Sequence, residues 1–183
     1  HDGLPVAFVI RGLLAKKSEQ SALEFIKAIR HASGQNYILG IGDKVYDFEA
    51  SATKVVRYTP VAGDSLVYHT NHPLANDDLK PWWAKRLQQR TPEELKNTNA
   101  YVRFASLESR LAKGVCDIDE RTVKEILRSK DSELYPICVP LRSGASVYTF
   151  GSTIMTLSEH PSLQVTFGPP DLSEYVLYSF RSH

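Results

Sequence analysis

The sequence has few cysteines, no excess of charge and no long apolar run. Only two cysteines, Cys116 and Cys138, occur among 183 residues, and they lack the CxxC or Cys/His spacing of a metal site. A disulfide between them has little support, and two small, half-buried thiols are the simpler interpretation. Lys and Arg total 22 against 21 Asp and Glu, so the net charge of +1 creates no field that favours nucleic acid. No apolar run approaches the roughly 18 residues that indicate a membrane span.

Several catalytic and ligand-binding signatures are also missing. The sequence has no Gly-rich phosphate loop, no Gly-x-Ser-x-Gly elbow and no His-Glu-x-x-His helix, which excludes these nucleotide-binding, serine-hydrolase and zinc-protease motifs. It opens on His1, without an initiator Met or a basic segment followed by an apolar core, and so predicts no signal peptide. We expect that a preceding segment has been cut off or lies outside this sequence.

What is present is typical of one globular domain. A length of 183 residues allows a sizeable core, and 42% hydrophobic with 23% charged residues is ordinary for a soluble protein. Neither a linker-like stretch nor an internal repeat interrupts the sequence. We therefore predict a single domain over residues 1–183.

The first part of the chain changes from helical to extended periodicity. Residues 4–15 are mostly apolar and predict a helix, and Pro5 suits the first turn of that helix. Ser18 offers an N-cap, Ser21-x-x-Glu24 resembles a capping box, and apolar residues at helical spacing predict an amphipathic helix over residues 18–31. Alternation and turn residues then predict an antiparallel meander with strands at residues 36–41, 45–49, 54–58 and 65–69.

The rest of the chain is predicted to hold a loop, further helices and four more strands. Residues 71–90 are polar and irregular, which indicates a long surface loop beside a site. Helices are expected from Thr91-Pro92-Glu93-Glu94, over residues 99–113 and after Asp119. Strands are expected at residues 135–139, 146–157, 163–167 and 175–180. Because strands cluster with strands and helices with helices, we predict a layered α+β fold rather than a parallel α/β sheet.

The most informative stretch is Tyr68-His69-Thr70-Asn71-His72-Pro73. It follows a predicted strand, and a strand end can hold a side-chain amide in place while leaving it open to a substrate. Asn71 has two interpretations: a turn former that bonds its own backbone, or a donor to the oxygen of a tetrahedral intermediate. Arg103 lies within an apolar helical face and also has two interpretations: it forms a surface salt bridge, or it fixes a charged group of the site.

Other polar residues near this stretch have simpler interpretations. His69 and His72 resemble a metal-binding pair, but the sequence shows no third ligand beside them. Asp77-Asp78 could act as a general acid and base, yet adjacent loop carboxylates are mostly solvated charge. Asp47 and Glu49 share one face of their predicted strand, where a cross-strand salt bridge is the plainer explanation.

The block His-Thr-Asn-His-Pro at residues 69–73 resembles the Thr-Asn signature of the choloylglycine hydrolase and isopenicillin N acyltransferase group of N-terminal-nucleophile hydrolases. Further segments resemble that group in the same order along the chain, at residues 3–14, 21–26, 36–39, 47–50, 103–104, 135–138, 149–157 and 165–170. The chain is therefore similar to the C-terminal portion of such an enzyme over most of its length.

This resemblance implies an αββα sandwich, in which two antiparallel sheets lie between helical layers. It also implies hydrolysis or acyl transfer at a linear non-peptide amide by an N-terminal Cys, whose own α-amine acts as the base. Matched to the family pattern, Asn71 would be the oxyanion donor and Arg103 the active-site arginine near the nucleophile. No cofactor is implied.

The chain departs from the family pattern at two places. Position 1 is His and both cysteines lie inside the chain, so the nucleophile would lie on an upstream segment or a separate chain. The arginine motif reads Tyr-Val-Arg-Phe without the usual preceding Ser, for which Thr98 or Asn99 could substitute. A noncatalytic scaffold or binding module that keeps the fold is the alternative, and a zinc hydrolase using His69 and His72 is a third.

The expected partner is a small-molecule amide substrate. Tyr68, Trp82 and Trp83 could line an apolar acyl pocket near the site, or the aromatic rings could simply anchor the loop. Bile-acid conjugates, penicillins, N-acyl amino acids and acylated signalling lactones all fit the same chemistry. Family likeness alone suggests a homo-oligomer, and neither nucleic acid nor a membrane span is expected.

Overall fold

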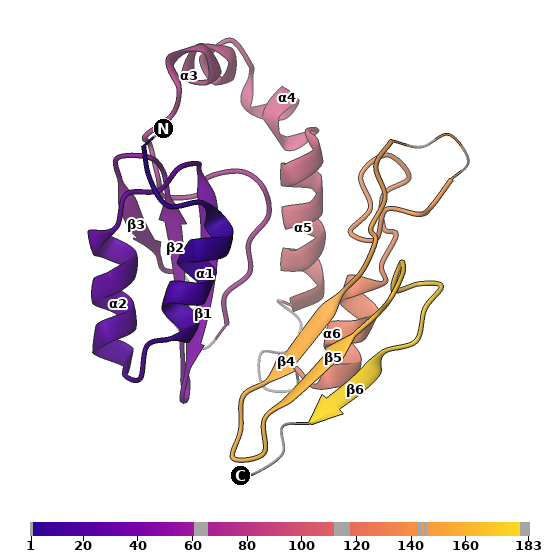
Figure 1. Ribbon diagram of the computed structural model, residues 1–183. Coiled ribbons are helices and arrows are strands. Elements are labelled where there is room, and N and C mark those ends of the chain that lie inside the picture. The colour runs from indigo at the N-terminus through magenta and orange to yellow at the C-terminus, as the bar shows by residue number, and fades with distance from the viewer. Residues whose placement is uncertain (1, 61–65, 112–117, 143, 145, 180–183) are drawn as a thin grey trace. The chain divides into compact units, whose positions relative to one another are not determined.

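Two compact units divide the chain, one from His1 to Thr91 and the other from Pro92 to His183 (Figure 1). The computed structural model describes residues 2–60, 66–111, 118–142, 144 and 146–179. Within these residues, no helix combines the length and the apolar character needed to cross a membrane.

The first unit begins with two helices, α1 (Val6–Leu14) and α2 (Glu19–Ala28). Both predicted helices are confirmed, although α2 ends three residues before His31. Ser18 caps α2, but the capping box pairs Ser18 with Ser21 rather than Ser21 with Glu24, because the side chain of Ser21 reaches back to the backbone of Ser18. Between the helices, a Cβ on Gly12 would lie 2.3 Å from Cζ of Phe25, so this glycine permits their close approach.

A three-stranded antiparallel sheet follows in the order β1 (Gln35–Ile41), β2 (Lys44–Ala50) and β3 (Val55–Tyr58). These are the first three strands that the alternating pattern predicts. The two-residue loop between β1 and β2 has Gly42 at its first position with a φ of 62°, as a type II′ hairpin turn requires. The register pairs Tyr37 with Phe48.

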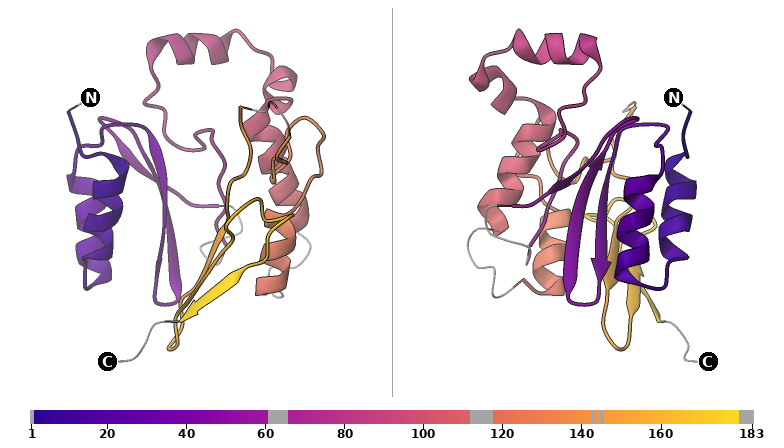
Figure 2. Two further views of the ribbon diagram at one scale, coloured as in Figure 1. Left: turned by 45° about the vertical axis from the view of Figure 1, so that its right-hand side comes forward. Right: turned by 90° about the vertical axis from the view of Figure 1, so that its left-hand side faces the viewer.

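The core of this unit lies between the sheet and its helices. Helices α1 and α2 lie side by side on one face of the sheet (Figure 2). The buried residues of this core come from α1, α2, β1 and β2, namely Val9, Ile26, Tyr37, Tyr46, Phe48 and Ala50. Burial of one such large side chain stabilises a fold by about 1.5–3 kcal/mol, so this layer is the main apolar contribution to the first unit.

The segment after β3 differs from its prediction. The described residues 66–69 form no strand; His69 and the chain that follows are instead hydrogen-bonded to the side chain of Glu49. Within the predicted loop 71–90, helix α3 (Pro81–Gln88) forms instead of irregular chain. Pro81 at its first turn and the good helix formers that follow explain this start.

The second unit contains the helices α4 (Pro92–Lys96), α5 (Asn99–Leu111) and α6 (Glu120–Leu127). All three confirm the sequence prediction within the described residues. The side chain of Asp119 caps α6 by accepting the N–H of Thr122 at 2.7 Å.

The second unit also contains a three-stranded antiparallel sheet. It is formed by β4 (Thr153–Thr156), β5 (Ser162–Val165) and β6 (Val176–Ser179), in that order. The strand predicted at residues 135–139 is wrong: Cys138 and Val139 make only isolated backbone bonds, to Ser129 and Thr149. Helices together with purely antiparallel sheets confirm the α+β class.

Candidate active site

A polar cavity lies on the side of the first sheet that α1 and α2 leave uncovered. Because side chains alternate along a strand, Asp47 and Glu49 point away from the helices that Phe48 contacts. The cavity has a volume of about 480 Å³. It is lined by Gly34, Gln35, Asn36, Glu49, Ala50, Ser51, His69, Thr70, Asn71, His72, Pro73, Asn76, Asp78 and Leu79.

The carboxylate of Glu49 holds this part of the chain together. Its Oε1 accepts from Nε2 of His69 at 2.8 Å and from the backbone N–H of Leu74. Its Oε2 accepts from the backbone N–H groups of Ala75 at 2.9 Å and Asn76 at 2.6 Å. The Glu49 side chain is 5% exposed, so these four donors replace water almost completely. A cross-strand salt bridge, the simpler expectation for Glu49, is not what forms.

Both histidines of the predicted site are fixed by neighbouring oxygens. The ring of His69 contacts the carbonyl of Thr70 through Nδ1 and Glu49 through Nε2. Nδ1 of His72 lies 2.9 Å from Oγ1 of Thr70, and the residue is buried. Among the residues described, no three His, Cys, Asp or Glu side chains come together as a metal site. The two rings therefore serve the hydrogen-bond network.

Asn71 lies between these histidines and lines the cavity as an exposed residue. Its neighbours on both sides are tied to the sheet or to each other through Glu49 and Thr70. Tyr68 is half-buried beside His69, and it is not among the described residues that line this cavity. The arrangement presents the Asn71 position to the cavity from an anchored segment.

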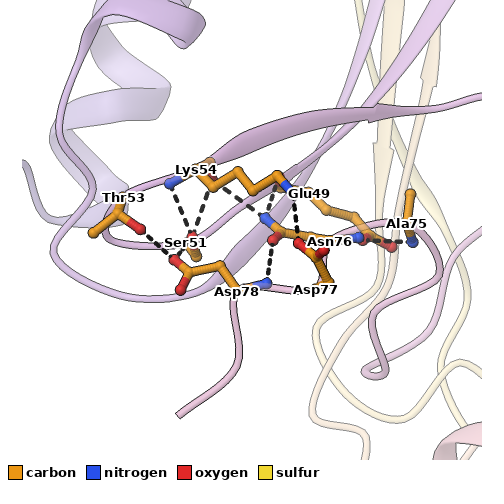
Figure 3. A network of polar contacts seen from close by, with 8 residues as sticks. All are labelled: Glu49, Ser51, Thr53, Lys54, Ala75, Asn76, Asp77 and Asp78. Atoms are coloured by element: carbon orange, nitrogen blue, oxygen red, sulfur yellow. Dashed lines mark hydrogen bonds and ion pairs between the residues drawn. The ribbon is translucent and has the colours of Figure 1, made fainter.

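Asn76 forms a second anchor (Figure 3). Its buried side-chain amide donates to the backbone carbonyls of Glu49 at 3.0 Å and Lys54 at 3.2 Å. Its Oδ1 accepts the N–H of Asp78 at 2.9 Å, and the Asp78 carboxylate accepts from the hydroxyls of Ser51 and Thr53. The chain from residue 74 to 78 is thereby joined to the end of β2 and the turn after it.

The two acidic residues of β2 have opposite electrostatic surroundings. Burial alone would raise the pKa of Glu49, but the hydrogen bonds from His69 and from three backbone amides outweigh it and lower the pKa. Burial raises the pKa of Asp47, and the bond from Asn36 only partly offsets it. Oδ2 of Asp47 has no hydrogen-bond partner among the described residues. Glu49 is thus held as a carboxylate, while ionised Asp47 is disfavoured.

A second cavity of about 780 Å³ adjoins the first. The two share Gly34, Ser51, Asp78 and Leu79 as lining residues. Trp82 and Trp83 of α3 line the second cavity, with their rings edge to face and 5.6 Å between centroids. The predicted substrate residue Trp82 thus stands at an apolar recess that continues from the polar one.

Arg103 lies in the second unit, on α5. Its Nε donates to Oδ1 of Asn99, one helical turn earlier, at 2.7 Å. Partial burial lowers the pKa of the guanidinium. Asn99 is one of the two residues that could replace the missing Ser of the arginine motif. The association of Arg103 with Asn71 in one site stays a prediction.

Cys138 is a free thiol with no exposed surface, and Cys116 lies outside the described residues. Its Sγ donates to Oδ1 of Asp171 at 3.1 Å, and Asp171 also pairs with Lys130. Burial raises the pKa of the Cys138 thiol, and the bond to Asp171 adds to the effect. A buried thiol with a raised pKa is a poor nucleophile, so Cys138 does not supply the missing one.

Sequence reasoning missed the importance of Glu49 and Asn76. The available signal was the alternation of β2, which places Asp47 and Glu49 on the sheet face opposite Tyr46 and Phe48. On a solvated face such charges are unremarkable. Only the return of residues 69–76 over this face buries them, and no local pattern in the sequence encodes that return.

Comparison with known proteins identifies one related family. The sequence profile of the acyl-coenzyme A:6-aminopenicillanic acid acyl-transferase family matches residues 1–163, and thus both the polar cavity and α5. A search of curated proteins gave no match.

Proposed function

The chain belongs to the acyl-coenzyme A:6-aminopenicillanic acid acyl-transferase family, and we propose that it hydrolyses or transfers the acyl group of a linear, non-peptide amide. Membership confirms the resemblance to this enzyme family and indicates an acyltransferase or hydrolase. The nucleophile, the residue roles and the reaction steps below are our proposal.

In this proposal an N-terminal Cys on an upstream segment or separate chain attacks the substrate carbonyl carbon. Its α-amine takes the thiol proton, and the carbonyl oxygen becomes negative in the tetrahedral intermediate. The side-chain N–H of Asn71 donates to that oxygen. Collapse of the intermediate breaks the C–N bond, and the leaving amine takes the proton from the α-amine. Water or a second amine then attacks the thioester carbonyl carbon and gives a proton to the α-amine. The C–S bond breaks, the acyl group stays on the attacking oxygen or nitrogen, and the sulfur regains its proton from the α-amine.

The observation that carries this proposal is the position of Asn71. It lines a cavity of about 480 Å³ on a segment whose flanks are bonded to the buried Glu49 carboxylate. A donor held in place before the reaction needs no reorganisation when charge develops on the substrate. Loss of one such donor typically raises the barrier by about 3 kcal/mol.

The adjoining cavity supports a role for α3 in substrate binding. Trp82 is 61% exposed, and an exposed indole beside a polar cavity can cover an apolar acyl group. We assign Trp82, with Trp83 next to it, to the acyl portion of the substrate. Tyr68 precedes Asn71 in the sequence and is half-buried beside His69. We propose that it supports the same substrate site.

Arg103 is proposed as the active-site cation. Its bond to Asn99 and its partial burial favour a fixed guanidinium over a freely moving surface charge. In the proposed mechanism it stabilises the nucleophile thiolate.

We also propose that the whole chain forms one domain of the four-layer αββα type. Each unit alone supplies one antiparallel sheet and helices. In the second unit, Gln164 of β5 bonds Glu120 of α6 and so faces that helix. The register places six residues on the opposite face, Thr153, Met155, Leu163, Val165, Val176 and Tyr178, and all but Thr153 are mainly apolar. An apolar sheet face of this kind is what a sandwich buries.

The test is amide hydrolysis by the protein expressed from its full reading frame. Probe substrates are N-acyl amino acids, a penicillin, a bile-acid conjugate and an acylated lactone. We expect Asn71→Ala and the isosteric Asn71→Asp to lower kcat by about 10²–10³-fold, since both remove the donor. Asn97→Ala, which removes an exposed amide in the second unit, is the control and should keep kcat. Unchanged turnover in both Asn71 variants would remove this residue from the mechanism.

One observation favours a second candidate, a noncatalytic scaffold or binding module. The only cysteine that the structure describes is buried and has a raised pKa. Mass spectrometry of the purified protein separates the two: a segment or companion chain that begins with Cys supports the enzyme. A single 20.5 kDa species without such a companion supports the binding module.

A further inference from the structure

We propose that Glu49 is the positioning residue of the site, which fixes Asn71 by binding both flanks of its segment to one buried carboxylate. This inference rests on the proposed function for the meaning of Asn71. The contacts that support it are independent of any substrate.

The hydrogen bonds of Glu49 close a loop around Asn71. His69, two residues before Asn71, and Leu74, three residues after it, donate to the same oxygen, Oε1. Since the two flanks meet at a single atom, the residues between them cannot move away from β2 without breaking at least one bond. Thr70 and His72 add a contact inside the loop at 2.9 Å.

The second oxygen fixes the direction in which the chain leaves this loop. Oε2 accepts the N–H groups of Ala75 and Asn76, while Asn76 donates its side-chain amide back to the Glu49 carbonyl. One residue of β2 therefore holds residues 69–76 through its side chain and its backbone. The rigid partner is a strand in the middle of its sheet, which is a suitable base for a catalytic donor.

Only a carboxylate of this length satisfies the whole arrangement. Glutamine would keep one acceptor oxygen but present an NH₂ to N–H groups that need an acceptor, so two of the four donors would lose their partner. Aspartate would keep both oxygens but withdraw them by one methylene. A donor displaced by about 1 Å can lower the rate by about 10²-fold, so both changes should reach Asn71 without touching it.

The kinetic test compares four proteins made from the full reading frame: wild type, Glu49→Gln, Asn71→Ala and the double variant. We expect Glu49→Gln to lower kcat by about 10- to 100-fold and to change KM less. In the double variant the loss should equal that of Asn71→Ala alone, because Glu49 acts through Asn71. Glu19→Gln is the control. The Glu19 carboxylate, like that of Glu49, accepts several hydrogen bonds, in its case from Lys44 and Tyr46, but it lies outside both cavities.

The outcomes separate the inference from the function on which it rests. If Asn71→Ala keeps full activity, the proposed role of Asn71 fails, whatever Glu49 does. If Asn71→Ala is impaired while Glu49→Gln matches wild type, the positioning role is wrong. Losses that multiply in the double variant would also overturn it, since Glu49 would then act elsewhere.

A structural measurement tests the inference without any substrate. In the ¹H–¹⁵N NMR spectrum, the side-chain amide signals of Asn71 should shift or broaden in Glu49→Gln and stay in place in Glu19→Gln. If Glu49→Gln does not fold, Glu49→Asp and His69→Gln serve instead, since each weakens the network in part. Asn71 signals that stay unchanged in the folded variants would contradict the positioning role.

Discussion

Strand β2 is buried on both of its faces from Tyr46 to Ala50, but the two faces are held in different ways. One face packs Tyr37 and Phe48 against α1 and α2 through contacts without direction. The other face is covered by the segment 69–76 and depends on hydrogen bonds to Glu49 and from Asn76. A packed apolar face depends on volume, whereas a buried polar face depends on the number and geometry of its donors.

The neighbouring acids of β2 show this dependence within a few ångströms. Glu49 receives four donors and has a lowered pKa, while Asp47 receives one from Asn36, keeps one unpartnered oxygen and has a raised pKa. Burial is similar for both, so the difference comes mainly from hydrogen bonding, and the charge of Glu49 adds to the raised pKa of Asp47. Glu49 stabilises this face, whereas Asp47 opposes burial whenever it is ionised.

The largest expected effect breaks the apolar face. Phe48→Ala removes a ring that is 1% exposed, and we expect it to lower the free energy of unfolding by about 3–5 kcal/mol in urea denaturation. Phe8→Ala is the matched control, because Phe8 is 62% exposed and should lose less than about 1 kcal/mol. Equal losses in the two variants would show that the apolar layer is not packed as described.

The next effect concerns pH on the polar face. An acid with a lowered pKa in the folded state stabilises the fold above its ordinary pKa, 4.5 for Glu49, and this contribution is lost as pH falls through the folded pKa. The loss should be about 2 kcal/mol, the size of a hydrogen bond to a charged group. Thermal unfolding between pH 6 and pH 2 should show it in wild type and not in Glu49→Gln. The same slope in both proteins would remove Glu49 as its cause.

A smaller effect is expected from a conservative substitution in the apolar face. Ile26→Val removes one methylene from a side chain with no exposed surface and should lower the free energy of unfolding by about 1 kcal/mol. A small loss of unfolding free energy of this size, measured by the same urea titration, is expected for nondirectional van der Waals contacts. A loss as large as that of Phe48→Ala would argue against this.

The smallest effect has the opposite sign. Asp47→Asn keeps an acceptor for Asn36 and removes a buried charge, so stability at pH 7 should rise, by less than about 1 kcal/mol. An acid with a raised folded pKa destabilises the fold as pH rises from its ordinary value of 3.8 through the folded pKa, and the variant should lack this decline. A destabilised variant would indicate that the Asp47 carboxylate has a favourable partner.

The sequence predicts the apolar face better than the polar one. The helical spacing of Ala22 and Ile26 and the alternation of Tyr46 and Phe48 are local patterns, so α2 and β2 were predicted near their observed bounds. The polar face results from contacts between residues more than twenty positions apart, such as Glu49 and Asn76. Family resemblance could select Asn71 as a candidate. No local sequence pattern could identify Glu49 as the residue that holds its segment, because that role depends on these long-range contacts.

Hydrogen exchange of three backbone amides tests the polar face most directly. Leu74, Ala75 and Asn76 lie outside any helix or strand, yet their N–H groups are bonded to Glu49. We predict that these amides exchange slowly in wild type and at the rates of an open loop in Glu49→Gln, while amides of β1 stay protected in both. Fast exchange of all three in wild type would contradict the account, because the buried carboxylate would then not be holding the segment that carries Asn71.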